Sequence, residues 1–349
     1  MAPTRTLSPG AIPKRFAVIS AVLLLAGCGA HTVGHGSRAE MNPIGPWQSA
    51  ALQDHPLAGR IWVPGERRFI TPDGLLSRLA SRRFVLLGER HDNPDHHRVQ
   101  AWITRRMIGE GRRPALAMEM FRRDQQPRID AHLEDNPGDS AGLGRATGWS
   151  RSGWPPWQQY EAIVRPIVTA ELPLVAANLA RGEVRAVIRR GLKSVGAERL
   201  RHLGLERPLS ARILAAIDRE IADSHCGMVD AARSRPFTHA QLLRDATLAA
   251  VMRRAAATAD GAVLIAGAGH ARKDRGVPYH LRRTTIGATE IFSLGIVEVV
   301  ESQDVPATYG AIYGASDLPF DAVWFTPRQE REDPCEAFRS MRKKRTERK

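Results

Sequence analysis

Short runs of apolar residues alternate with stretches of helical spacing along the chain, and this alternation predicts the fold. The runs are Phe84–Leu87, Ala115–Met118, Leu174–Ala177, Ala262–Ala266 and Ile291–Val299, with Val323–Phe325 as a further candidate. Continuous apolar strands separated by helices are typical of βαβ units, in which helices cover both faces of a sheet. We therefore expect an α/β fold with a mainly parallel sheet flanked by helices.

The helical stretches differ in how clearly their ends are marked. The clearest helix begins at Asn93-Pro94, since asparagine caps a helix and proline fits its first position, and it ends at Gly109 or Gly111. The stretch 181–259 shows little strand pattern and several helical ones. We expect one α/β domain over residues 57–327, with this stretch as a mostly helical insertion.

The N-terminus has the pattern of a targeting segment. Positive residues at Arg5, Lys14 and Arg15 precede the apolar run Phe16–Gly27, which ends at Cys28. The run is shorter than the roughly 20 residues that a membrane-spanning helix needs, but it suits the apolar region of a signal peptide. We expect a signal peptide over residues 1–27.

The residues around the expected cleavage site favour a lipid anchor. Leu25-Ala26-Gly27-Cys28 resembles the lipobox of bacterial lipoproteins, in which the cysteine is acylated after cleavage. Two or more acyl chains hold a protein stably on a membrane. Gly29 resembles the pattern of lipoproteins sorted to the outer membrane of Gram-negative bacteria. We expect a lipoprotein of the cell envelope, anchored through Cys28.

The segments that flank the expected domain lack periodicity. Residues 28–56 are rich in Gly, His, Ser and Pro and read as a flexible tether, and residues 328–349 form a basic tail. The formal charge of +14 favours anionic partners, and export makes nucleic acid an unlikely one. Two further cysteines, Cys226 and Cys335, make no disulfide framework, and we expect them to stay unpaired.

Polar residues end the predicted strands. Glu89 and His91 follow the first run, Glu119 the second, Asn178 the third, and His270 the run that ends at Ala266. The carboxyl ends of parallel strands share one edge of a sheet, and ligands bind there. Because two carboxylates and two imidazoles suit a divalent metal, His91, Glu119 and His270 are candidate metal ligands and Glu89 a candidate general base.

A second class of function is binding without turnover. Haem iron takes a Tyr, His, Met or Cys ligand, and its propionates favour nearby cations. Tyr279 lies in a basic segment with Arg272, while His96 and His97 stand in the first turn of the helix after Asn93. The chain lacks the Gly-x-Ser-x-Gly elbow of serine hydrolases and the His-Glu-x-x-His motif of zinc proteases.

Several motifs, in order, resemble one known family. Leu86–Gln100 closely resembles the signature of ChaN-like lipoproteins, the haem-binding uptake group of the Tiki superfamily. Met118–Gln125 and Gly269–Pro278 are further matches, and the resemblance covers roughly residues 55 to 300. It implies an α/β fold, a lipid anchor and a role in haem or iron acquisition. It also implies haem ligation by tyrosine with help from histidine, in a dimer.

The resemblance leaves two functions open. The favoured one is a haem- or iron-binding protein that serves an outer-membrane uptake system as a homodimer. Its candidate cofactor-binding residues are Tyr160, Tyr279, His96, His97, Asn178 and Arg272. The alternative is a metal-dependent hydrolase, because metal-dependent proteases of the superfamily carry two Gly-x-x-His motifs, found here as Gly88–His91 and Gly267–His270. Whether the protein is an enzyme is open at this point.

Overall fold

A computed structural model describes residues 42–336, except 225, 227–229, 285 and 334. The expected signal peptide, Cys28 and the first part of the expected tether lie outside the described residues, as do residues 337–349. Among the described helices none is long and apolar enough to cross a membrane.

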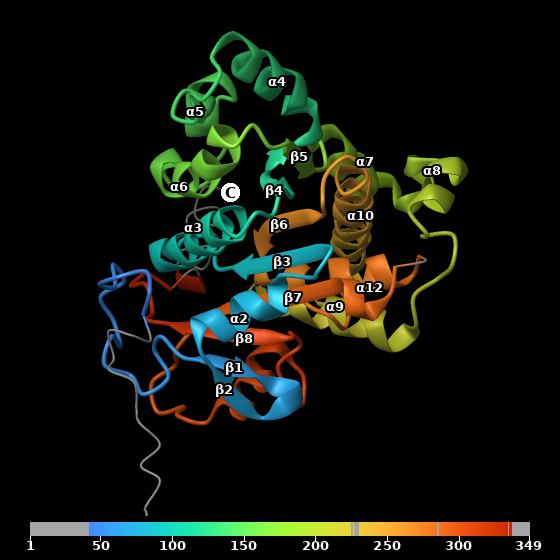
Figure 1. Cartoon of the computed structure of the whole chain (residues 1–349). Helices are drawn as coiled ribbons and strands as arrows, with labels where there is room; N and C mark the ends of the chain where they lie inside the picture. The colour runs from blue at the N-terminus through green and yellow to red at the C-terminus, as the bar shows by residue number, and fades with distance from the viewer. Residues whose placement is uncertain (1–41, 225, 227–229, 285, 334, 337–349) are drawn as a thin grey trace, which may run out of the picture. The chain divides into compact units, whose positions relative to one another are not determined.

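One eight-stranded sheet forms the centre of the fold, in the order β2-β1-β8-β7-β3-β6-β4-β5 (Figure 1). The strands are β1 (Ile61–Val63), β2 (Arg68–Ile70), β3 (Phe84–Glu89), β4 (Ala115–Arg122), β5 (Leu174–Asn178), β6 (Ala262–Gly267), β7 (Ile291–Glu298) and β8 (Ala322–Thr326). The six strands from β8 to β5 are parallel to one another, which confirms the expected α/β class. Strands β1 and β2 were not predicted, and they add an antiparallel edge.

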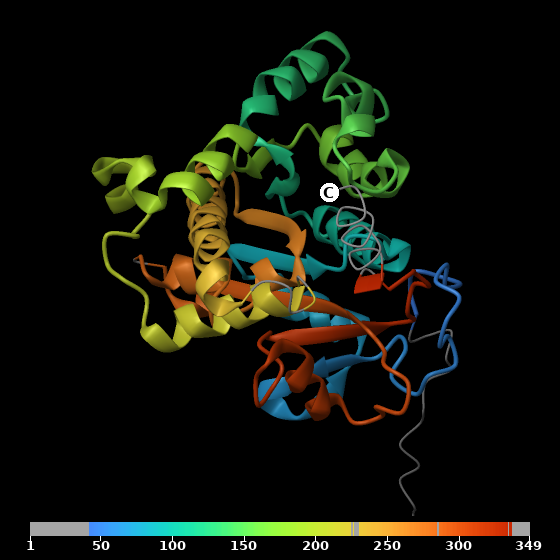
Figure 2. The ribbon, with the colours of Figure 1, turned by 180° about the vertical axis from the view of Figure 1, so that it is seen from behind.

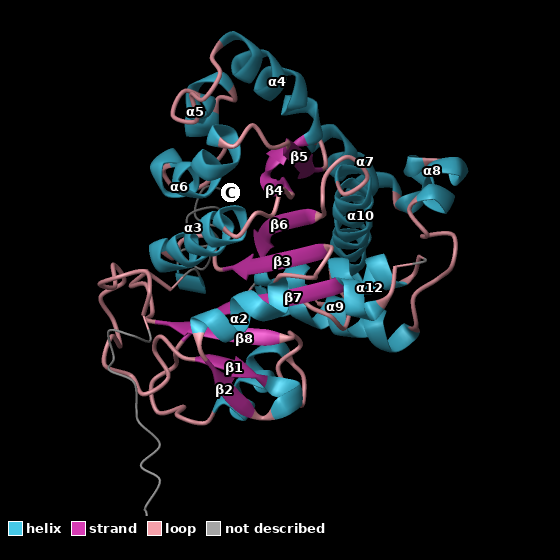
Figure 3. Cartoon of the chain, in the orientation of Figure 1, coloured by secondary structure: helices cyan, strands magenta, loops and turns pink. Residues whose placement is uncertain are grey.

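Helices cover both faces of this sheet (Figures 1, 2 and 3). The α-helices are α2 (Pro72–Leu79), α3 (Pro94–Gly109), α4 (Gln126–Asp135), α5 (Leu143–Ala146), α6 (Trp157–Thr169), α7 (Arg181–Arg190), α8 (Ala197–His202), α9 (Ala211–Ser224), α10 (Ala231–Ala255), α11 (Ala268–Ala271) and α12 (Val277–Arg282). Alternate side chains of β3 enter different cores. Val85 and Leu87 pack with α2, α3 and α6, while Phe84 and Leu86 pack with α10 and α12.

The helix at the end of β3 begins as its sequence predicts. The side chain of Asn93 accepts hydrogen bonds from the backbone N–H groups of Asp95 and His96, and Pro94 takes the first helical position. Helix α3 then runs to Gly109, one of the two predicted ends. The stretch 181–259 contains α7 to α10, whose apolar faces form a third core.

Two flanking segments are packed more closely than expected. Ser49 is buried and donates its hydroxyl hydrogen to Asn93, so the tether ends before residue 56. Arg328, which was assigned to a basic tail, pairs with Ala51 in an isolated antiparallel bridge.

The expectation for the two cysteines was wrong. Cys226 and Cys335 form a disulfide, with their Cα atoms 5.6 Å apart. The two residues are separated by 109 positions in the sequence. The disulfide joins two segments that are distant in sequence, so it depends on the tertiary fold. The local sequence around each cysteine gives no information about this pairing.

Gly88 stands in β3 where a side chain has no room. A Cβ atom there would lie 2.7 Å from the Cβ of Ala271 and 3.0 Å from the Cα of Ala268. We expect Gly88→Ala to lower the free energy of unfolding by about 1–3 kcal/mol, the usual cost of overpacking a core. Urea denaturation would measure this loss. Gly109→Ala is the control, because a Cβ at Gly109 meets no atom within 4 Å, and an equal loss there would contradict the prediction.

Candidate functional site

The carboxyl ends of β3, β4 and β6 bring two imidazoles and one carboxylate together. Glu119 lies between the two histidines: its Oε1 is 3.3 Å from Nε2 of His270, and its Oε2 is 3.9 Å from Nε2 of His91. Oε2 also accepts a hydrogen bond of 2.9 Å from the backbone N–H of Gly267. The neighbouring order β3-β6-β4 explains why residues so distant in sequence meet here.

Glu89 is the centre of a second group of contacts, on the same sheet edge. Its Oε1 accepts from the Tyr160 hydroxyl at 2.6 Å and lies 2.7 Å from Nδ1 of His91. Its Oε2 is 3.4 Å from Nε2 of His97. Burial alone would raise the pKa of Glu89, but the neighbouring His97 and His91 hold it well below its usual range. Glu89 is therefore an anion bound by three side chains.

Tyr160 and His97 contact Glu89 from the protein interior. Tyr160 is fully buried in α6, and His97 is buried in α3 and also contacts Gln159 through Nδ1 at 2.9 Å. Burial and the negative charge of Glu89 raise the pKa of Tyr160. Its hydroxyl proton is held by the Glu89 carboxylate, so Tyr160 orients Glu89 in this arrangement and does not present a free phenolate.

His270 has a carboxylate on each side. Its Nδ1 lies 2.5 Å from Oδ1 of Asp245 in α10, and Gln241 contacts the same nitrogen at 3.2 Å. Burial would lower the pKa of His270, but Glu119 and Asp245 raise it to about 10. The sequence reasoning assigned no role to Asp245 or Gln241. Their spacing of four residues on one helix face was the available signal.

The charged state of His270 gives the stability a pH dependence. The pKa of His270 in the folded protein is about 10, above the ordinary value of 6.5. The stabilisation that protonated His270 gives to the folded state is therefore fully present below pH 6.5. We expect the free energy of unfolding to fall as the pH rises from 6.5 to 10. Urea denaturation across this range would measure the fall, and His270→Gln should flatten it. An unchanged slope in that variant would contradict the assignment.

The predicted metal ligands do not form a metal site in this arrangement. In the part of the chain that the structure describes, no group of three or more His, Cys, Asp and Glu side chains is arranged to hold an ion. His91, Glu119 and His270 are close, but their nitrogen and oxygen atoms face one another directly. The divalent-metal alternative therefore has no support.

Asn178 lies at the end of β5, where its Oδ1 accepts a hydrogen bond from Arg244 at 3.1 Å.

A cavity of about 1220 Å³ opens beside Glu89 and His91. Its apolar lining comes mainly from the end of β7 and from η6 (Pro306–Tyr313), together with Trp154. The Trp154 ring lies 4.7 Å from the His91 ring, centroid to centroid. Three arginines also line the cavity: Arg90, Arg328 and Arg331. Three carboxylates line it as well, those of Glu89, Asp92 and Glu298, so the cavity combines apolar surface with charges of both signs.

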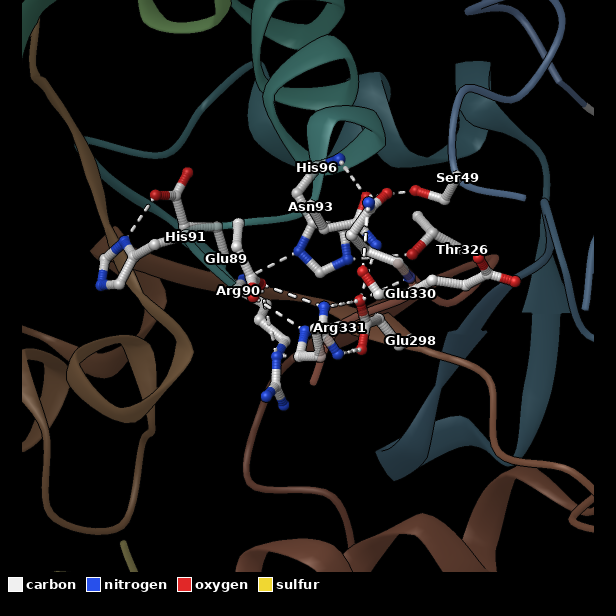
Figure 4. A network of polar contacts seen from close by, with 12 residues as sticks. Ser49, Glu89, Arg90, His91, Asn93, His96, Glu298, Thr326, Glu330 and Arg331 are labelled. Atoms are coloured by element: carbon white, nitrogen blue, oxygen red, sulfur yellow. Dashed lines mark hydrogen bonds and ion pairs between the residues drawn. The ribbon is translucent and has the colours of Figure 1, made fainter. Parts of the chain in front are cut away.

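A polar network holds the wall of this cavity together (Figure 4). Arg331 binds both Glu298 and Asp92, and Asn93 donates to Glu298 at 2.8 Å. His96 is part of the same network: Nδ1 accepts from the backbone N–H of Arg90 at 2.8 Å, and Nε2 contacts Thr326 at 2.9 Å. Burial lowers the pKa of His96 to about 3. His96 is therefore a neutral residue that joins the β3 and β8 ends.

The four tyrosines occupy different surroundings, and one of them lines the large cavity. Tyr279 packs against the third core, and Tyr309 is buried, with its hydroxyl bonded to the backbone of Val300 and Gln303. Tyr313 lines the cavity. The guanidinium of Arg272 lies 5.5 Å from the Tyr313 ring centroid. No pattern in the sequence distinguishes Tyr313, because its position depends on how η6 packs.

The sequence comparison identifies the family. Residues 75–281 match the family described as "Haem-binding uptake, Tiki superfamily, ChaN". The chain belongs to this family. No curated protein sequence matches significantly.

Three solved structures illustrate what this chain is similar to. The structure titled "Cofacial heme binding to ChaN of Campylobacter jejuni" aligns with a TM-score of 0.54 at 18% identity, over 76% of this chain and 95% of that one. The type III effector HopBA1 aligns at 13% identity with a TM-score of 0.36, over 74% and 93%. A mutant of the erythromycin esterase EreC aligns at 12% identity with a TM-score of 0.43, over 79% and 99%. The first of these supports the ChaN fold for this chain.

Proposed function

We propose that this protein binds haem in the cavity of about 1220 Å³, with Tyr313 as the iron ligand. The observation that carries the proposal is the position of Tyr313 in the apolar lining of this cavity. The chain also belongs to a haem-binding family. A porphyrin needs apolar surface for its ring, cations for its propionates and a Tyr, His, Met or Cys side chain for its iron. The cavity residues meet all three requirements.

Each part of the cavity has a role in this proposal. Trp154 and the exposed Ile312 would contact the porphyrin ring, and Arg328 would attract a propionate. Burial raises the pKa of Tyr313, and the positive charge of Arg272 only partly opposes that rise, so the phenol would lose its proton on binding iron. Bound haem supplies an iron centre for storage or transfer.

His91 is the candidate for assisting haem binding. Its Nδ1 hydrogen bond to Glu89 fixes the ring, and its side chain is one-third exposed at the cavity. A histidine held in this way would present its imidazole to haem bound in the cavity. This role replaces that of metal ligand, which was one of our expectations for His91.

The experiment is a haemin titration of the full chain, purified in detergent. We expect a saturable shift of the Soret band. The absence of saturation, or a spectrum like that of free haemin in detergent, would overturn the proposal. Light scattering of the same samples tests whether two copies share the haem. The exposed Ile312, which is 51% accessible beside Tyr313, favours such pairing.

We also propose that the protein is anchored in the cell envelope, in the outer membrane of a Gram-negative bacterium, and serves haem uptake. This proposal is supported by the sequence around Cys28 and by the family. Mass spectrometry of the mature N-terminus should find Cys28 acylated. In Cys28→Ala the protein should leave the membrane fraction, and retention there would contradict the proposed anchor.

A further inference from the structure

A second cavity, of about 470 Å³, lies against α10 and α8. Helix α8 stands at the outer side of α7, away from α3 (Figures 1 and 2). The two cavities share no lining residue. The residues of interest in the second cavity are Arg123, Arg199, Arg253, Arg254 and Thr247.

The cavity carries a surplus of positive charge. Oε1 of Glu183 accepts from Nη2 of Arg123 at 2.7 Å and from Nη1 of Arg199 at 2.5 Å. One carboxylate therefore faces two guanidinium groups. Arg253 and Arg254 form no ion pair within the described part of the chain, although Arg253 contacts the backbone oxygen of His202 at 3.5 Å.

Several hydrogen-bond donors of this cavity are buried without partners. Thr247 is only 2% exposed, and its hydroxyl has no hydrogen-bond partner among the described residues. The same holds for Nε of Arg123, Nη2 of Arg199 and Nε of Arg253. Because buried polar groups are almost always paired in native proteins, four such donors around one cavity favour the binding of an acceptor there. An anion with several oxygen atoms would satisfy them together.

We propose that this cavity binds a phosphoryl anion. Guanidinium groups bind phosphate oxygens through two parallel hydrogen bonds, and a threonine hydroxyl supplies a further donor. The volume of about 470 Å³ lies in the range of small-molecule sites. Leu203 and Val251 add apolar surface for the organic part of the ligand, which is either a soluble phosphate ester or a phospholipid headgroup.

Calorimetric titration of the full chain in nonionic detergent with inorganic phosphate tests the proposal. Thr247→Val keeps the shape of the side chain but removes the hydroxyl, and we expect phosphate to bind about 10-fold more weakly, as the loss of one hydrogen bond to a charged group predicts. The double variant Arg253→Gln with Arg254→Gln should abolish binding. Circular dichroism would verify that each variant folds.

The control removes two adjacent arginines elsewhere. Arg189 and Arg190 are exposed at the end of α7 and do not line this cavity, so replacing both by glutamine should leave phosphate binding unchanged. Equal weakening in this control, or unchanged binding in Thr247→Val, would overturn the site. Failure of wild-type protein to bind phosphate would overturn it as well.

Two further titrations distinguish the sources of the phosphoryl group. Glycerol 3-phosphate represents a soluble ester, and short-chain phosphatidylglycerol below its micellar concentration represents a lipid headgroup. Tighter binding of the lipid, weakened by Thr247→Val, supports the headgroup. Equal or tighter binding of the ester supports a soluble ligand.

Discussion

Replacing Tyr313 by phenylalanine should lower the affinity for haem by at least about 100-fold. Removing a residue that hydrogen-bonds to a metal ligand lowers the affinity for the metal by about 10- to 100-fold. Removing the ligand itself is expected to lower the affinity further. Tyr313 lines the large cavity, beneath the guanidinium of Arg272. The absorption band that arises from electron transfer between a phenolate and ferric iron should disappear in this variant. Haemin titration followed by absorption spectroscopy measures both effects.

Tyr309→Phe is the matched control for this experiment. Tyr309 belongs to the same helix, η6, but it is buried and does not itself line the cavity, and its hydroxyl binds the backbone of Val300 and Gln303. We expect it to affect stability and to leave the haem spectrum unchanged. If Tyr313→Phe retains the wild-type spectrum, Tyr313 is not the ligand, and the same titration of His91→Ala identifies the next candidate.

Replacing Glu119 by glutamine should destabilise the fold by about 3–5 kcal/mol, the cost of removing one partner from a buried ion pair. Glu119 is 4% exposed and lies between His91 and His270. Burial would raise the pKa of Glu119, but His270 and His91 hold it well below its usual range. Glutamine keeps the shape and the acceptor for Gly267, so the loss isolates the charge. Urea denaturation at pH 7 would measure it.

An exposed ion pair provides the comparison for Glu119. Glu66 binds Arg68 and Arg78 at the surface, where water screens the charges, so Glu66→Gln should leave the denaturation curve almost unchanged. If Glu119→Gln were as mild as Glu66→Gln, the two histidines would be neutral in the folded protein.

The strands of the sheet could be predicted because their burial leaves a simple pattern. A parallel strand covered on both faces is apolar along its whole length, as Phe84–Leu87 and Ala262–Ala266 are. Strands β1 and β2 have three residues each, and β2 begins with an exposed arginine, so neither stands out. The parallel order then explains why the strand-end residues Glu89, Glu119 and His270 meet.

The side chains that helices contribute were harder to predict. The direction of a helical side chain depends on how the helix is rotated against the sheet, and this rotation is a property of the whole core. Tyr160 and His97 contact Glu89, Asp245 contacts His270, and Tyr313 lines the cavity, and the local sequence does not specify these partners. Arg272 was a candidate cofactor-binding residue, but it is buried and bound to Asp274.

The bond between Cys226 and Cys335 has a consequence for when the proposed haem-binding cavity is completed. Ser224 and Arg331, which line that cavity, stand two and four residues from these cysteines. Thiols stay reduced in the cytosol and are oxidised in the periplasm. If the chain is exported as proposed, the disulfide that links these two segments of the cavity lining forms only after translocation. The ability to hold haem would then be acquired at the destination, and newly made chains would not compete for the haem that cytosolic enzymes require.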